Sequence, residues 1–396
     1  MMMRTIRPRR LAAAVAVVAV LAIGLVLVLR QVWTTTGMPA GPANAYKQVN
    51  LVSDLPGTAQ RLDPKLVNPW GIAASSTSPF WVADNNAGAA TVYTGAGTGF
   101  SGAPASVTIP APAGSAADAA GAPTGIVFNG SSGFRISQAG ASAPSVFLFA
   151  TEDGTIAGWS PKVSASSAVL AVDNSAVNAV YKGLAIATTP SGMFIYAANF
   201  RSGTVDVYDS NFAKVTRAGA FADPNIPAGF APFNVHNLGG KLYVSYAKQK
   251  PDKHDDLAGA GNGFVDVYDP TGTLIRRLVS NAQLDSPWGL AMAPAGFGKF
   301  SNDLLVGNFG DGKINAFDPN SGKFLGTLAD ANHKAIQITG LWGLSFGNSQ
   351  NAGGRDTLFF TAGVGDEKHG LIGSLVSATA TSSAPSASSP PGLYGY

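Results

Sequence analysis

The chain carries six copies of one short segment, and the first is NPWGIA at residues 68–73. The other copies are APTGIVF (122–128), YKGLAIA (181–187), APFNVHN (231–237), SPWGLAM (286–292) and GLWGLSF (340–346). They align on Gly71, Gly125, Gly183, Asn234, Gly289 and Gly343, which recur at intervals of 51 to 58 residues. A regular period of this length indicates a repeat architecture in which each repeat is one structural unit.

Further β-rich runs follow each copy. In the third repeat, FIYAANF (194–200) is followed by GTVDVYD (203–209), and the other repeats have equivalent runs. Aromatic and β-branched residues bounded by Gly, Asn and Asp are typical of strands. A fourth run, such as 273–279 in the fourth repeat, completes four strands. Four antiparallel strands in each of six repeats predict an all-β fold, a six-bladed β-propeller with four-stranded antiparallel blades.

The sixth repeat lacks its outer strand, because after Val376 the chain turns to Ser, Ala, Thr and Pro. A spare strand precedes the first repeat, where YKQVNLV (46–52) has a strand pattern. We expect this N-terminal strand to pair into the last blade and close the ring, which removes two exposed sheet edges. The sequence therefore predicts a propeller over residues 46–376 and a flexible tail over residues 377–396.

Composition excludes several classes of protein. The 396 residues are 46% hydrophobic and only 12% charged, which argues against disorder caused by high net charge. The absence of Cys excludes disulfide frameworks, Cys-ligated zinc, iron–sulfur clusters and thiol nucleophiles. The sequence has no P-loop, no G-x-S-x-G motif and no H-E-x-x-H motif.

The N-terminal segment, residues 1–45, is predicted to direct export. Residues 1–30 hold five Arg and no acidic residue, so the net charge of +3 comes from this segment and gives no support for nucleic-acid binding. Residues 11–29 form an uncharged run behind the arginines, the pattern of an export signal or a signal anchor. Ala43-Asn44-Ala45 matches a cleavage pattern, so a secreted or periplasmic protein and an anchored one both remain open.

The opening NLVSDLPGTAQRLDPKLVNPWGIA (50–73) resembles that of an uncharacterised family of secreted bacterial six-bladed β-propeller proteins. The wider arrangement is similar to NHL-repeat and gluconolactonase-like propellers. This resemblance implies the fold and an exported location. In gluconolactonase-like propellers, acidic and amide side chains that reach the channel hold a metal, which activates water or a carbonyl group.

One mouth of the central channel is the expected site, because the starts of the inner strands and the loops after the second strands meet there. The inner-strand starts supply Trp70, Lys182, Phe233, Asn234, Trp288 and Trp342. The three tryptophans come from blades that are neighbours in a closed ring. They could form an aromatic arc on which a sugar or a flat organic ligand stacks, or they could wedge the blades together.

A calcium site is the alternative use of this mouth. Asp84, Glu152, Asn199 and Asn308 lie at or next to the ends of second strands, and Ca²⁺ takes carboxylate and amide oxygens. The alternative is a structural role, because Asp and Asn are also common residues in turns.

Histidines and one lysine complete the set. His236 replaces a small or aliphatic residue of the other inner strands, so it is the predicted general base, with a hydrogen-bonded inner histidine as the alternative. His254, Asp255, Asp256 and His369 lie in loops expected on the same face, where a metal is a further possibility. We expect Lys182 to form an ion pair with Glu152.

Two functions follow from these residues. The first is an exported propeller, a monomer, that binds a small organic or saccharide ligand or a protein partner at the channel mouth. The second is a Ca²⁺-dependent hydrolase or lactonase, so the sequence leaves open whether the protein is an enzyme. Neither function involves nucleic acid, and membrane contact is expected only through an uncleaved N-terminal segment.

Overall fold

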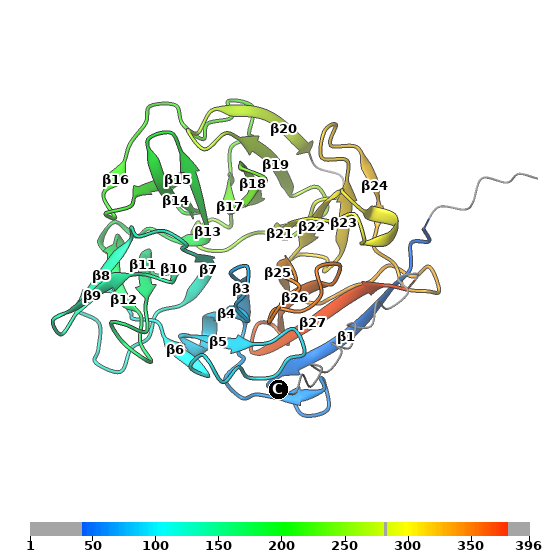
Figure 1. Ribbon diagram of the computed structural model, residues 1–396. Helices are drawn as coiled ribbons and strands as arrows, with labels where there is room; N and C mark the ends of the chain where they lie inside the picture. Colours follow the sequence, from blue (N-terminus) through cyan, green and yellow to red (C-terminus); the bar gives the residue numbers. More distant parts are fainter. Residues whose placement is uncertain (1–41, 281–282, 379–396) are drawn as a thin grey trace, which may run out of the picture. The chain divides into compact units, whose positions relative to one another are not determined.

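The six repeats form six blades arranged in a ring (Figure 1). The computed structural model describes residues 42–280 and 283–378. The first three blades, each given from its inner to its outer strand, are as follows. Blade one holds β3 (Pro69–Ala73), β4 (Phe80–Asp84), β5 (Ala89–Tyr93) and β6 (Ser106–Thr108). Blade two holds β7 (Pro123–Phe128), β10 (Phe147–Thr151), β11 (Thr155–Trp159) and β12 (Val169–Asp173). Blade three holds β13 (Tyr181–Thr189), β14 (Gly192–Asn199), β15 (Thr204–Asp209) and β16 (Lys214–Val215).

The other three blades repeat this order. Blade four holds β17 (Phe230–Leu238), β18 (Lys241–Lys248), β19 (Gly263–Tyr268) and β20 (Leu274–Ser280). Blade five holds β21 (Pro287–Met292), β22 (Leu304–Asn308), β23 (Ile314–Phe317) and β24 (Phe324–Thr327). Blade six holds β25 (Leu341–Phe346), β26 (Leu358–Val364), β27 (His369–Ser377), β1 (Tyr46–Ser53) and β2 (Arg61–Leu62). The six four-stranded antiparallel blades confirm the predicted fold class.

Close approach of neighbouring inner strands explains the repeated glycine. A Cβ atom added to Gly71 would lie 2.5 Å from the Thr124 carbonyl oxygen of blade two. A Cβ atom at Gly125, Gly183 or Gly289 would also collide with the next blade, and at Gly343 it would lie 2.6 Å from the Trp70 carbonyl oxygen of blade one. Blade four has Asn234 at this position, and its Nδ2 donates to the Trp288 carbonyl oxygen at 2.8 Å. Neighbouring inner strands therefore contact one another at this repeated position, and these contacts help to close the ring.

The ring closes through the N-terminal strand, as predicted. β1 pairs antiparallel with β27, from Tyr46 opposite Ser377 to Ser53 opposite Leu371. The two strands lie side by side at the edge of the ring, blue against red in Figure 1. β27 extends to Ser377. The short strand β2 then adds a fifth strand, parallel to β1, that the repeat pattern did not predict.

The sheets of adjacent blades pack face to face. Leu148 and Ile156 of blade two and Leu184 and Ile195 of blade three, for example, belong to one buried cluster. A strand covered on both faces is buried at every position rather than at alternate ones. β4, β10 and β22 are buried throughout, and only their last residues, Asp84, Thr151 and Asn308, are polar.

Some elements lie outside the repeat pattern. Blade two carries an inserted hairpin of β8 (Arg135–Gln138) and β9 (Ala141–Pro144) between its first two strands. Three 3₁₀ turns are η1 (Asn85–Ala87), η2 (Ser175–Val177) and η3 (Gly298–Phe300). The predicted export segment and the predicted tail fall almost entirely outside the described residues. Within the described ranges, no helix has the length and apolar character needed to cross a membrane.

Candidate functional site

Aromatic side chains fill the centre of the ring near the starts of the inner strands. The Trp70 and Trp342 rings stack with their centroids 3.5 Å apart, and the Trp288 ring stands edge-on to both, at 6.0 and 5.7 Å. Each of the three tryptophans is at most 4% exposed. Trp70 and Trp288 belong to blades that are not neighbours, so their contact spans the channel. We call this group, with Phe200, Phe233 and Phe309, the aromatic plug.

The three predicted tryptophans thus lie together, but they pack against one another, Trp70 and Trp342 face to face and Trp288 edge-on to both. The Trp288 Nε1 donates to the Lys182 carbonyl oxygen of blade three at 2.9 Å, and the Trp342 Nε1 donates to Asn68 Oδ1 at 3.3 Å. Such contacts between blades are those expected if the tryptophans hold the blades together rather than stack on a ligand. The plug has a pocket on each side, because Trp70 and Trp342 line one pocket and Trp288 lines another.

The pocket at the predicted mouth is acidic. It has a volume of about 560 Å³ and is bounded by inner-strand starts and by loops after the second strands. Its charged and titratable side chains are Glu152, Asp255, Asp256, Asp366 and Glu367 with Lys182, Lys250 and His254. Negative groups therefore outnumber positive ones in this acidic pocket.

Lys182 lies at the bottom of the acidic pocket and is only 2% exposed. Its Nζ pairs with Glu152, as predicted, and lies 3.4 Å from Asp255 Oδ1 and 5.1 Å from the centroid of the Trp70 ring. Burial on its own would lower the pKa of Lys182, but the attraction of Glu152 and Asp255 outweighs it and raises that pKa. The lysine is consequently a fixed buried cation.

The long loop after β18 supplies one wall of the acidic pocket. His254 Nδ1 lies 2.9 Å from Asp255 Oδ1, and this hydrogen bond raises the pKa of His254 and lowers that of Asp255. Asp256 is buried and its Oδ2 has no hydrogen-bond partner among the described residues. The sequence expected these three residues on this face, and they line the pocket there. His369, expected with them, instead bonds Asp54 through Nδ1 at 2.8 Å.

Glu367 is a site residue that the sequence did not single out. Burial, reinforced by the charge of Glu152, raises the pKa of Glu367 to about 7. Asn68 Nδ2 donates to its Oε2 at 3.3 Å. The residue lies in the turn between β26 and β27, GVGDEKHG, where only the histidine had drawn notice. The sequence could have identified Glu367 as a site residue by its position in a loop that follows a second strand, on the face of the predicted mouth.

The four predicted calcium ligands are dispersed. Glu152 lines the acidic pocket, and Asn85 Nδ2 donates to its Oε2 at 2.8 Å. Asp84 is buried and accepts from Thr91 Oγ1 at 2.7 Å. Asn308 donates to Gln283 and Asp311, while Asn199 lines a different pocket beside Asp206. Among the described His, Asp and Glu residues, Glu152, His254 and Asp255 are the group whose ligand atoms lie within 4.8 Å of one another.

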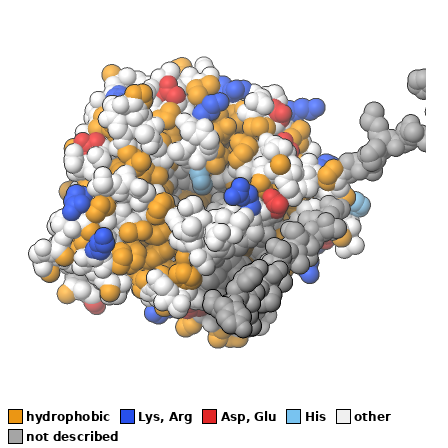
Figure 2. Space-filling view, in the orientation of Figure 1, with side chains coloured by type: hydrophobic (Ala, Val, Ile, Leu, Met, Phe, Trp, Pro, Cys, Tyr) orange, Lys and Arg blue, Asp and Glu red, His pale blue; other side chains and the backbone are white. Residues whose placement is uncertain are grey.

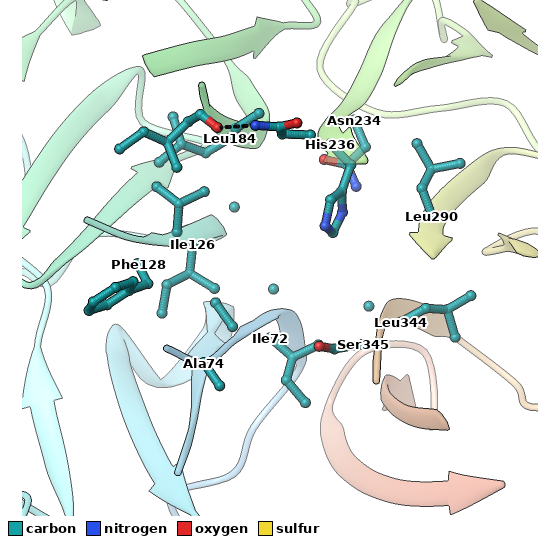
Figure 3. Close-up of a pocket in the computed structure, with 18 of the residues that line it drawn as sticks. Ile72, Ala74, Ile126, Phe128, Leu184, Asn234, His236, Leu290, Leu344 and Ser345 are labelled. Carbon is teal, nitrogen blue, oxygen red and sulfur yellow. Dashed lines mark hydrogen bonds between the residues drawn. The ribbon is translucent and has the colours of Figure 1, made fainter. Parts of the chain in front are cut away.

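The second pocket lies on the other side of the aromatic plug and contains His236. All six inner strands contribute to its wall, and its volume is about 320 Å³. Figure 2 shows it as a hollow at the centre of the visible face, with a histidine inside. In Figure 3 the His236 ring points into the cavity between Ile126, Leu290 and Leu344. His236 is thus separated from Glu152 and the acidic pocket, so the predicted base and the predicted metal ligand do not share a site.

Burial lowers the pKa of His236 to about 4. No charged side chain lines this pocket among the described residues, and the cross-strand partner is Tyr243, whose pKa is raised by burial. The imidazole is therefore neutral at physiological pH, with one nitrogen as donor and the other as acceptor.

The free energy of unfolding should depend on pH because of His236. An unfolded chain takes up a proton on His236 near pH 6.5, whereas the folded chain does so near pH 4. Stability should therefore fall as the pH drops through this window, by about 3 kcal/mol relative to a His236→Gln variant. Denaturant melts of both proteins at a series of pH values measure the difference. An identical pH dependence of the two proteins would contradict the lowered pKa of His236.

Two viral proteins are similar in sequence to this chain over most of its length. No family model matches the chain. A protein of Acanthamoeba polyphaga mimivirus that is described as uncharacterised is 33% identical over 347 residues, covering 85% of this chain and 82% of the viral one. A second such protein of the same virus is 32% identical, covering 85% and 88%. The chain belongs to the family of these two viral proteins. Each match therefore covers more than four fifths of both chains.

Three solved structures that are similar to this chain share little sequence with it. A Bacteroides thetaiotaomicron protein of unknown function is 10% identical, with a TM-score of 0.50 over 84% of this chain and 76% of that one. Streptogramin B lyase is 13% identical, with a TM-score of 0.44 over 83% and 96%. A gluconolactonase from Xanthomonas campestris is 14% identical, with a TM-score of 0.36 over 58% and 81%. These similarities concern the fold alone.

Proposed function

We propose that this protein is an exported, monomeric binding protein whose acidic pocket takes a small organic ligand that carries an amine, including an amino sugar. The observation that supports this is the charge imbalance of a pocket of about 560 Å³, in which five carboxylic acids face two lysines and one histidine. Lys182 is already neutralised by Glu152 and Asp255. The remaining acids therefore have no strong cation of their own.

The pKa values of Glu367 and Asp256 indicate that the ligand carries a positive charge. The pKa of Glu367 is raised to about 7 and that of Asp256 is also raised, in both cases first by burial. A bound ammonium group would stabilise both carboxylates and lower their pKa values. The apolar part of the ligand would lie against Trp70 and Trp342 at the bottom of the pocket, where small exposed parts of the rings remain. Export is proposed from the arginines and the uncharged run within residues 1–30.

Matched pairs of ligands test the proposal. Titration calorimetry should show tighter binding of benzylamine than of benzyl alcohol, and of glucosamine than of glucose, because only the amines carry the positive charge. Glu367→Gln should weaken amine binding, and the affinity for amines should fall as the pH drops through about 7, where Glu367 takes up a proton. Asp118→Asn removes the same charge from an exposed position outside the pocket and is the control. Equal binding of amines and alcohols, or equal effects of the two variants, would refute the proposal.

A metal-dependent hydrolase or lactonase is the second candidate, favoured by the grouping of Glu152, His254 and Asp255 within 4.8 Å. A metal there would have to displace Lys182 from both carboxylates. The group with a suitable pKa for a base in that pocket is Glu367, not His236. Calorimetric titration of metal-free protein with Ca²⁺ and Zn²⁺, followed by assays with an aromatic lactone, separates this candidate from the first. Stoichiometric metal binding together with turnover that is lost in Glu367→Gln would favour the enzyme.

A further inference from the structure

The His236 pocket is a separate chamber at the other end of the channel. Most of its residues come from the middle and the ends of the inner strands, with Asn234 and Trp288 lining it from nearer the starts, whereas the acidic pocket is bounded by the starts of the inner strands. The stacked tryptophans of the aromatic plug lie between the two pockets and are at most 4% exposed. A molecule in one pocket therefore has no contact with the charged groups of the other.

Most of the side chains that line this chamber are apolar, while polar atoms, backbone groups included, make up about half of its exposed surface. The apolar side chains include Ile72, Ile126, Phe128, Leu184, Leu290 and Leu344, which surround the cavity in Figure 3. None of the lining residues in the described ranges is Asp, Glu, Lys or Arg. A charged ligand would lose its hydration there without gaining a counter-charge, which disfavours ions of either sign.

The polar groups of the chamber are not equivalent. Asn234 donates to the Trp288 carbonyl oxygen and accepts from the Val235 amide, both at 2.8 Å. Asn237 donates to the Ile186 carbonyl oxygen at 2.8 Å and accepts from the Gly240 amide at 3.0 Å. The His236 ring makes no hydrogen bond or ion pair with any described residue, although it points into the cavity. A neutral imidazole in this position has one donor and one acceptor to offer.

We propose that this chamber is a second binding site, which takes an uncharged and mostly apolar small molecule whose single hydroxyl or carbonyl group forms a hydrogen bond with His236. Its volume of about 320 Å³ lies within the range of small-molecule pockets. The apolar wall supplies the affinity, and His236 fixes the orientation of the ligand and selects molecules with a polar group. Ser345, whose Oγ is 3.4 Å from the Phe346 carbonyl oxygen, lines the same wall and offers a weaker second contact. This site is independent of the proposed amine site.

The probes for this site are 2-naphthol and naphthalene, which differ by one hydroxyl group. Binding to the full chain is followed by the fluorescence of each probe. We expect 2-naphthol to bind about three- to tenfold more tightly than naphthalene, the effect of one hydrogen bond to a buried partner. His236→Phe should remove this preference while leaving naphthalene binding nearly unchanged.

Two further variants locate the site. Ala74→Trp places a large ring at the wall of the chamber and should abolish binding of both probes, and thermal melts establish that this variant is folded. Glu367→Gln changes only the acidic pocket and should leave both affinities unchanged. The proposal is overturned if a folded Ala74→Trp variant still binds the probes, if His236→Phe keeps the preference for 2-naphthol, or if neither probe binds. Since none of these outcomes involves amine binding, failure here is distinguishable from failure of the proposed function.

Discussion

Replacing Trp342 by alanine is expected to lower the free energy of unfolding by about 3–5 kcal/mol. The Trp342 ring is 1% exposed, stacks on Trp70 at 3.5 Å and on Phe309 at 4.0 Å, and meets Trp288 edge-on. Truncation would remove these contacts, together with the one to the Phe233 ring at 5.9 Å, and leave a cavity in the middle of the aromatic plug. Loss of its Nε1 would also remove the hydrogen bond to Asn68. Urea denaturation followed by circular dichroism measures the change.

Trp342→Phe is the matched variant, because it keeps an aromatic ring at the same position. Its loss should be clearly smaller than that of the alanine variant. If Trp342→Ala is as stable as the wild type within about 1 kcal/mol, the plug is not a structural element. The tryptophans would then be free to serve as a ligand platform.

Replacing Glu152 by alanine is expected to cost about 3 kcal/mol, because it leaves the buried Lys182 without its main counter-charge. Lys182 is 2% exposed, and its remaining partner, Asp255, lies 3.4 Å away in a half-exposed position. The charge of Lys182 would then be only partly compensated in a buried environment. Thermal and denaturant melts at pH 7 give the difference in stability.

Lys182→Met supplies the control for this pair. It removes the buried cation and keeps most of the volume, so its own effect should be small. Glu152→Ala introduced into the Lys182→Met background should then cost much less than it does in the wild type. Equal costs in the two backgrounds would show that Glu152 stabilises the fold by some route other than the ion pair.

The fold was predictable from the sequence because its physical requirements are local and repeated. The inner-strand glycine recurs since each inner strand lies against the next one, and a Cβ atom at Gly71 or Gly343 would collide with the neighbouring backbone. The closing strand was predictable for a related reason, because the sixth repeat lacked a strand that the N-terminal segment could supply. The hairpin of β8 and β9 and the short β2 were not predicted, since each occurs in a single blade.

The candidate site was less predictable, because a repeat gives the position of a residue along a strand but not the direction of its side chain. The repeat predicts that Trp342 lies at the start of an inner strand, but its stacking on Trp70 depends on the directions of rings from different blades. His236 was identified as a break in the repeat, but its separation from Glu152 follows from the plug between them. Glu367 went unnoticed because the significance of a turn residue depends on the neighbours that the fold gives it.

Closure of the ring by β1 and β27 has a consequence for biosynthesis. A ribosome produces Tyr46–Ser53 early and His369–Ser377 only near the end of the chain. During most of translation the nascent chain therefore carries an unpaired strand that includes Leu51 and Val52, two side chains that are buried once the ring has closed. Unpaired apolar strands are prone to associate with other chains. A newly made chain is therefore protected from aggregation through this strand only once the last blade is complete.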